Sequence, residues 1–314
     1  MDHLKSSIAL LPPSTWVQAF FLAAAGGILA LHVLPRDVRG ELIDYGARRA
    51  NNGHQLNGKS SGKSRSVLAL ATSLMSSAQV PHSWFWHFYA LSVFSSAFWA
   101  WQYARRGSFL ASLAEAQARS GGPSVGMGHI LLAWLMMVSQ GTRRLYECFF
   151  VLKPGRTPML LAHWILALAY YAAINVAVWI EGSGAILDSW TSQHHLALTF
   201  TSRDIAAMVV FVAAWLTQNQ CHRHLASLKK YTLPSEGAFG YLVCPHYTCE
   251  CVIYLAIALM VAPAGSFFNT SVLSGAVFVV VNLGATAQGT KQWYAQKFGA
   301  DKIAARWAMI PFVF

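Results

Sequence analysis

The sequence predicts an all-α integral membrane protein of about seven transmembrane helices. Of its 314 residues, 55% are hydrophobic and only 11% are charged, whereas a soluble domain carries about 25% charged residues. The hydrophobic residues gather into runs close to the roughly 20 residues that a helix needs to cross a bilayer core. Polar and basic segments separate these runs. This pattern excludes the soluble globular classes.

Seven hydrophobic segments cover residues 16–34, 84–101, 127–151, 159–180, 204–220, 250–263 and 267–289. No cationic leader with a small-residue cleavage site is visible, so we expect the first segment to be a retained helix. Pro263 separates the short sixth segment from the seventh, and these two form either a broken pair or one hairpin. We expect residues 1–314 to form a single membrane domain with a polar cytosolic loop over about 35–83.

The distribution of Lys and Arg predicts the orientation in the membrane. The net charge of +11 could indicate nucleic-acid binding. The basic residues lie between hydrophobic segments, however, and we exclude nucleic acid as a partner. Alternate loops carry 16 and 5 Lys and Arg residues. Because basic loops stay in the cytosol, we expect a lumenal N-terminus and a cytosolic C-terminus.

Three short motifs are set aside. Residues 53–60 match the phosphate-loop pattern GxxxxGK[ST], but an Arg-rich polar stretch stands where that motif needs a strand. Cys244, His246, Cys249 and Cys251 fit no usual zinc spacing, so we expect buried thiols and no metal. Asn269 begins a glycosylation sequon so close to the membrane that we expect it to be unused.

Polar and ionisable residues cluster at the ends of five hydrophobic segments, where they are costly and indicate function. The clusters are His87 with Tyr89, Arg143 and Arg144 with Glu147, Gln218 to His224, Cys244 to Glu250, and Gln288 to Tyr294. An ion pair between Arg144 and Glu147, three residues apart, would account for these two charges in the third segment. It would not account for the second arginine, Arg143, for which the sequence shows no partner. In the predicted topology the first four clusters meet at the cytosolic face, where the last segment also ends. A cationic pocket there suits a phosphate-bearing ligand, and the apolar helices offer a chamber for a lipid.

The chain resembles the steroid 5α-reductase family over about residues 80–314. The resemblance depends on the order and spacing of several motifs: His87-Phe88-Tyr89, Arg143-Arg144-Leu145-Tyr146-Glu147-Cys148, Gln218 with Cys221-His222, Cys244-Pro245-His246-Tyr247 with Glu250, Trp293-Tyr294, and Arg306 with Ile310-Pro311-Phe312. It implies a seven-helix membrane fold that binds NADPH from the cytosolic side. Within the family, the chain is most similar to the branch that reduces polyprenoid lipids.

The resemblance also implies a set of cofactor-binding residues. Gln218 and His222 align with an Asn-x-x-x-Asp motif, and His246 and Glu250 align with an Asn-x-x-x-Glu motif; three of these four differ in type from the family. Arg144, Tyr294 and Arg306 complete the implied set. The Tyr and the Gln-Glu pair that bind a steroid ketone have no counterpart here, because the Tyr position falls near Gly141. This departure argues against a steroid substrate.

The expected reaction is NADPH-dependent reduction of the α-double bond of a polyprenoid in the endoplasmic reticulum, as a step in dolichol synthesis for protein N-glycosylation. Hydride attacks an electron-poor carbon, so we expect polyprenal rather than polyprenol as the direct substrate. The alternatives are a 3-oxo-steroid or an enoyl thioester. The site acid is expected among Tyr89, His87 and Glu147, with His246 as a further candidate. Tyr89 is preferred because a phenol stays protonated at neutral pH, and only one of Tyr89 and His87 can face the pocket.

Overall fold

The computed structural model describes residues 11–33, 78–120, 125–153, 155, 158–191, 200–229 and 231–314. Most of the expected loop 35–83, including the motif at 53–60, lies outside these residues. The described chain is helical apart from a two-stranded antiparallel ladder, in which β1 (Gln79–Val80) pairs with β2 (Met159–Leu160). This ladder joins the start of one long helix to the start of another.

Each of the seven expected segments overlaps a long helix in the described part of the chain. These helices are α2 (Pro13–Val33), α6 (Trp86–Arg105), α8 (Met127–Phe150), α9 (Leu161–Ile180), α11 (Ser202–Ser227), α12 (Pro245–Met260) and α13 (Thr270–Phe298). Three of them, α2, α9 and α13, are long and apolar enough to cross a membrane by composition alone. α6, α8 and α11 carry polar clusters, which lower their mean hydropathy, and α12 is apolar but only 16 residues long.

Local sequence signals explain where several helices begin and end. At the start of α11, Thr201 accepts a hydrogen bond from the backbone N–H of Asp204, which caps the Thr201 N–H in return. Pro245 occupies the first turn of α12, where its missing N–H costs nothing. Asn269 caps α13. Arg106, with a φ of 51°, ends α6 in the left-handed conformation.

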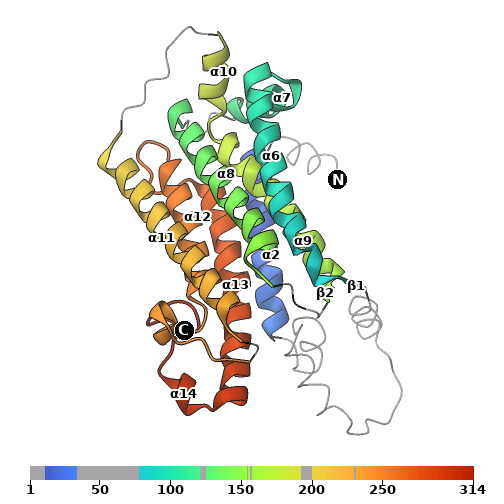
Figure 1. The fold of residues 1–314 in the computed structure, drawn as a ribbon. Coiled ribbons are helices and arrows are strands. Elements are labelled where there is room, and N and C mark those ends of the chain that lie inside the picture. The colour runs from blue at the N-terminus through green and yellow to red at the C-terminus, as the bar shows by residue number, and fades with distance from the viewer. Residues whose placement is uncertain are drawn as a thin grey trace.

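The helices form one bundle (Figure 1). α12 packs between α11 and α13, α13 packs on α2, and α6 packs on both α8 and α9. A short turn after Pro263 joins α12 to α13, and the Asn269 N–H donates to the Ala258 carbonyl. Of the two expected arrangements for the last two segments, the structure has the hairpin. α12 also begins five residues before the expected position, so its first turns contain His246 and Glu250.

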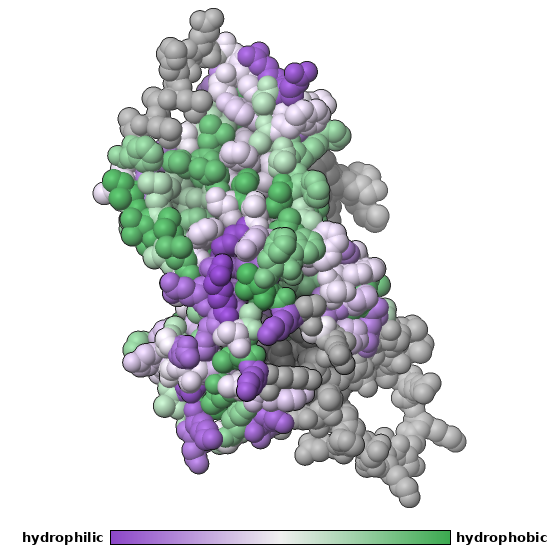
Figure 2. Space-filling model, in the orientation of Figure 1, coloured by the Kyte–Doolittle hydropathy of each residue, from purple (hydrophilic) through white to green (hydrophobic). Residues whose placement is uncertain are grey.

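The outer surface of the bundle suits a lipid environment. Ile205, Val209, Val212 and Leu216, on successive turns of α11, are all exposed. Figure 2 shows a broad band of hydrophobic residues across the upper and middle part of this face, with hydrophilic residues at the upper tip and more of them below the band. An apolar stripe facing outward is the reverse of a soluble helix, which turns its apolar side inward.

Two helices were not expected from the sequence. α7 (Ser108–Ala118) and α10 (Ser183–Thr191) fall in segments predicted to be loops, and they pack on each other at one end of the bundle. Gln117 of α7 accepts a hydrogen bond from the backbone N–H of Ser14 and donates one to its hydroxyl. These hydrogen bonds join the packed pair of α7 and α10 to the start of α2.

The C-terminal segment secures the start of α12. Three short helical elements lie next to long helices: η1 (His82–Phe85) precedes α6, η2 (Gly237–Gly240) precedes α12, and α14 (Asp301–Ala304) follows α13. Leu242 and Trp307 form a parallel bridge. The Cys244 N–H donates to the Ala308 carbonyl, and the Thr248 hydroxyl donates to the Met309 carbonyl at 2.6 Å. The entry into α12 is therefore held by backbone hydrogen bonds to the tail.

Candidate active site

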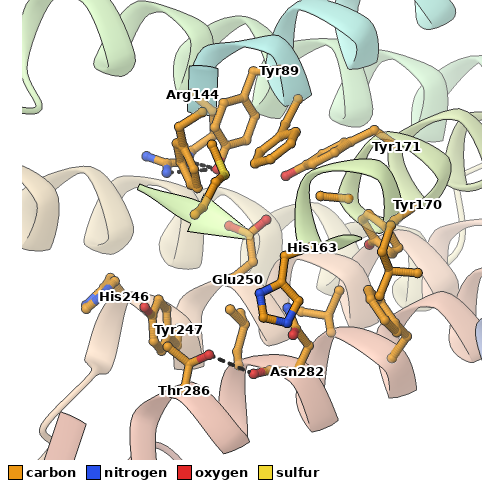
Figure 3. A pocket seen from close by; sticks show the side chains of 18 of the residues that line it. Tyr89, Arg144, His163, Tyr170, Tyr171, His246, Tyr247, Glu250, Asn282 and Thr286 are labelled. Carbon is orange, nitrogen blue, oxygen red and sulfur yellow. Dashed lines mark hydrogen bonds between the residues drawn. The ribbon is translucent and has the colours of Figure 1, made fainter. Parts of the chain in front are cut away.

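One cavity of about 430 Å³ lies inside the bundle and receives side chains from all seven long helices. One part of its wall is polar and contains Arg144 and Glu250. Much of the rest is apolar and aromatic, and includes Ile28, Leu31, Phe85, Phe88, Leu166, Ala167, Tyr170, Tyr171, Tyr254, Phe278, Val279 and Leu283. A mostly apolar pocket with a few convergent polar groups is typical of a site for an organic ligand. Figure 3 shows this wall from close by.

Six of the ten expected site residues line the cavity. They are Tyr89, Arg144, Gln218, His222, His246 and Glu250. Four do not line it: His87, Glu147, Tyr294 and Arg306. The structure thus brings together residues from α6, α8, α11 and α12 that are as much as 161 residues apart in the sequence.

Glu147 lies behind the cavity wall and is completely buried. It forms an ion pair with Arg143 at 3.0 Å and a second, shorter one with Arg144. Nδ1 of His222 lies 2.7 Å from the same carboxylate, and the Asn219 amide donates to it at 2.6 Å. Both carboxylate oxygens are therefore occupied, and the carboxylate serves to neutralise the two arginines.

Arg143 also has partners, although the sequence suggested none. Its guanidinium donates to the Gln140 side chain at 2.7 Å and to Gln218, and it lies 4.9 Å from the ring centre of Trp215. Its ion pair with Glu147 spans four residues, so both arginines share one carboxylate on one helical face. Arg143 is therefore a paired charge in the described structure.

Arg144 holds Tyr89 in place. Its Nε and one terminal nitrogen donate to the Tyr89 hydroxyl at 3.1 and 2.9 Å. The phenol oxygen therefore acts as an acceptor toward Arg144, and its own proton remains available for another acceptor. Figure 3 shows this pair at the cavity wall. A phenol whose oxygen accepts from a guanidinium can still donate its one proton to a ligand oxygen in the cavity.

Two glutamines connect the arginines to the second carboxylate. The Gln140 amide donates to Gln218 and to Oε2 of Glu250, each at 3.0 Å. Gln218 donates to the same carboxylate oxygen at 2.5 Å and to the His246 backbone carbonyl at 3.1 Å. Both amides are buried and fully used. This arrangement fixes Glu250 as an acceptor that lines the cavity from α12.

His246 precedes Glu250 by one helical turn, so both residues lie on the same face of α12. Its Nδ1 is a buried atom with no hydrogen-bond partner among the described residues. The ring packs near that of His222, with 5.6 Å between centroids. A buried ring nitrogen without a partner is costly unless a ligand satisfies it.

His87, Tyr294 and Arg306 lie elsewhere. His87 packs against the indole rings of Trp84, Trp86 and Trp164, on the outer side of α6. Tyr294 packs near the end of α13, and Arg306 donates to the Pro234 carbonyl at 2.7 Å. Among the histidine and tyrosine at the start of α6, only Tyr89 therefore reaches the cavity.

Several cavity residues were not singled out from the sequence. His163, Tyr170 and Tyr171 come from α9, and Asn282 and Thr286 come from α13 (Figure 3). Asn282 and Thr286 are polar residues one turn apart within an apolar run, and that pattern could have indicated them. The α9 residues carried no such signal. His163 lies near the helix start, where a histidine also suits the membrane interface, and the two tyrosines lie in the middle of an apolar run.

The donor set fits a nicotinamide nucleotide. The free Nδ1 of His246 and the carboxylate of Glu250 lie one turn apart, which suits the donor and acceptor groups of a carboxamide. Among the described residues, no group of three or more His, Cys, Asp and Glu side chains could hold a metal ion. Cys244, Cys249 and Cys251 are buried and form no disulfide among the described residues.

Comparison with known proteins agrees with this chemistry. Residues 159–314 match the family model for 3-oxo-5-alpha-steroid 4-dehydrogenase. This region contains α9, α11, α12 and α13, and thus much of the cavity wall.

Curated relatives extend over most of the chain. Polyprenal reductase 2 of Oryza sativa subsp. japonica is 26% identical, covering 94% of this chain and 96% of the relative. Polyprenal reductase 1 of Oryza sativa subsp. indica is 28% identical, covering 91% and 93%. Polyprenal reductase of Saccharomyces cerevisiae is 26% identical, covering 74% and 75%. The names of these relatives and of the family model denote oxidoreductases. Residues 159–314 therefore form a domain of the steroid 5α-reductase family.

Proposed function

We propose that this protein reduces the α-double bond of polyprenal with NADPH and so forms dolichal. The main structural support is the Tyr89–Arg144 pair, because the Tyr89 hydroxyl lines a largely apolar cavity and donates to no acceptor among the described residues. The similarity to polyprenal reductases supports the same substrate class. The net conversion of polyprenol to dolichol would then supply the lipid for protein N-glycosylation.

An aldehyde suits this site better than an alcohol. Hydride addition to a double bond requires that the negative charge moves to an electronegative atom, and the carbonyl oxygen of an α,β-unsaturated aldehyde accepts it. Polyprenol has no such acceptor. The Tyr89 hydroxyl would donate to the developing oxyanion, and Arg144 would stabilise the phenol as it does so.

The residues proposed to bind NADPH are those carried over from the family. His246 and Glu250 would bind the carboxamide or ribose, Gln218 and His222 would support them, and Arg144 would contribute positive charge. The cofactor supplies the hydride. Tyr294 and Arg306 lie outside the cavity. Their proposed contacts would be to the nucleotide end of NADPH, which would extend out of the cavity.

We further propose an endoplasmic reticulum location with seven membrane spans and the cavity open to the cytosol. The excess of basic residues in alternate loops supports this orientation. A reporter fused after Phe314 should be digested by protease added to sealed microsomes, and one placed before Met1 should be protected. The opposite pattern would contradict both the orientation and the use of cytosolic NADPH.

The substrate can be tested directly. Purified protein in detergent is given NADPH together with polyprenal, polyprenol, a 3-oxo-4-ene steroid or an enoyl thioester, and products are identified by mass spectrometry. We expect polyprenal alone to be reduced efficiently. Reduction of polyprenol without added aldehyde would contradict the proposal, and preference for the steroid or thioester would assign the alternative named from the sequence.

Tyr89→Phe tests the proposed donor. Removing one oxyanion donor lowers turnover by about 10²–10³-fold in well-studied enzymes, and we expect a loss of that order with NADPH affinity retained. Tyr103→Phe is a matched control. Tyr103 lies on the same helix as Tyr89, and its hydroxyl donates to Ser189 away from the cavity. Wild-type turnover in Tyr89→Phe would contradict the assignment.

A further inference from the structure

The proposed reaction needs two separate proton-handling groups. The aldehyde oxygen requires a hydrogen-bond donor, and the neighbouring α-carbon must gain a proton after hydride reaches the β-carbon. Tyr89 has a single hydroxyl proton and is held by Arg144 as the donor to oxygen. A second acid must therefore line the cavity, and it should lie where the polar wall meets the apolar wall.

His163 lies at this boundary. It is in the first turn of α9, and Leu166, Ala167 and Tyr170 follow it at spacings of three, four and seven residues on the same helical face. All four line the cavity, so this face of α9 changes from an imidazole to apolar and aromatic side chains within two turns. Figure 3 shows the His163 imidazole projecting from α9 into the cavity. An aldehyde bound with its oxygen in the polar part would place its α-carbon near this boundary.

The other histidines of the cavity are less suited. Nδ1 of His222 lies between Glu147 and Arg144, at 2.7 and 2.8 Å, so this ring belongs to the ion-pair network. His246 lies beside His222 on the proposed cofactor wall. His82 stacks on Phe85 in η1, before the start of α6.

We propose that His163 donates the proton to the α-carbon of the substrate; this inference rests on the proposed function. In the balanced step, hydride adds to the β-carbon, the double-bond electrons move toward oxygen, and an enolate forms against Tyr89. The imidazolium of His163 then gives its proton to the α-carbon, and the enolate electrons restore the C=O bond. The neutral imidazole regains a proton from water.

Isotope labelling separates this proposal from the proposed function. With NADPH deuterated at the transferred position, wild-type protein should place deuterium on the β-carbon of polyprenal; absence of this label would refute the function itself. With unlabelled NADPH in D₂O, the wild type should place deuterium on the α-carbon in one configuration, because a fixed donor reaches one face only. The product is trapped at once as the alcohol to prevent exchange.

His163→Gln keeps a polar side chain but removes the acid. We expect turnover to fall by about 10²-fold or more, with KM and NADPH affinity unchanged and with the α-deuterium now in both configurations. Added imidazole should restore part of the turnover of His163→Ala. His129→Gln, which alters the histidine paired with Asp204 away from the cavity, should behave as wild type. The proposal would be overturned if His163→Gln still placed the α-deuterium in a single configuration. It would also be overturned if His82→Gln, and not His163→Gln, gave both configurations.

Discussion

Two buried carboxylates, Glu147 and Glu181, are held in different ways in the described structure. Glu147 is bound by two arginines, a histidine and an asparagine directly behind the cavity. Glu181, at the end of α9, accepts hydrogen bonds from the backbone N–H and hydroxyl of Ser271 in the first turn of α13. A carboxylate at a helix N-terminus is stabilised by the helix dipole and needs no cationic partner.

This comparison shows that burial of a charge does not by itself indicate a functional site. Glu181 joins two helices, and no residue of its immediate surroundings lines the cavity. Glu147 does not touch the cavity either, but its partners Arg144 and His222 do. The difference lies in the neighbours, and three substitutions should make it measurable.

The largest effect is expected for Glu147→Gln. It leaves Arg143 and Arg144 buried without a full counter-charge, and loss of one partner of a buried ion pair costs about 3–5 kcal/mol. Thermal unfolding of the purified protein in detergent should show a strongly lowered midpoint, with loss of activity. Glu236→Gln removes an exposed carboxylate that pairs with His224 and should leave the midpoint unchanged. Equal midpoints for the two variants would contradict the role of Glu147.

Arg144→Ala should have an intermediate effect. The change removes hydrogen bonds between charged groups, each worth about 1.5–3 kcal/mol, and frees the Tyr89 side chain. We expect NADPH affinity to fall far more than affinity for the lipid, measured by equilibrium binding of each. If Arg144 is only an ion-pair partner of Glu147, unfolding would shift while NADPH affinity stayed at the wild-type value.

Glu181→Gln should have the smallest effect. The amide oxygen can still accept hydrogen bonds from Ser271, and only the attraction between a negative charge and the helix dipole is lost, which is worth about 0.3–1 kcal/mol. Turnover and NADPH affinity should remain those of the wild type. A loss of activity similar to that of Glu147→Gln would show that the two ends of the bundle are coupled.

The sequence predicted the helical class and the approximate position of each long helix in the described part of the chain, because apolar runs are local signals. It also predicted that the polar clusters of α6, α8, α11 and α12 meet, since alternating helix direction brings their ends to one face. It did not predict which side chains enter the cavity. His87 and Tyr89 are two residues apart, and only packing of α6 against α8 and α9 decides which one faces inward.

The short helices α7 and α10 were missed because neither is long enough or apolar enough to stand out from a loop. His163 was missed for a different reason. Its proposed role depends on a cavity shared with residues of α12 and α13 more than 80 positions later in the chain, and such proximity leaves no local pattern.

The network of Arg143, Arg144, Glu147 and Glu250 contains two positive and two negative side chains, joined through Gln140 and Gln218. It is therefore balanced in charge before any ligand arrives, which reduces the cost of burying it in a membrane. An anionic nucleotide that approaches this network brings uncompensated negative charge. Its binding should then be linked to proton uptake, and calorimetry in buffers of different ionisation enthalpy would measure the number of protons taken up.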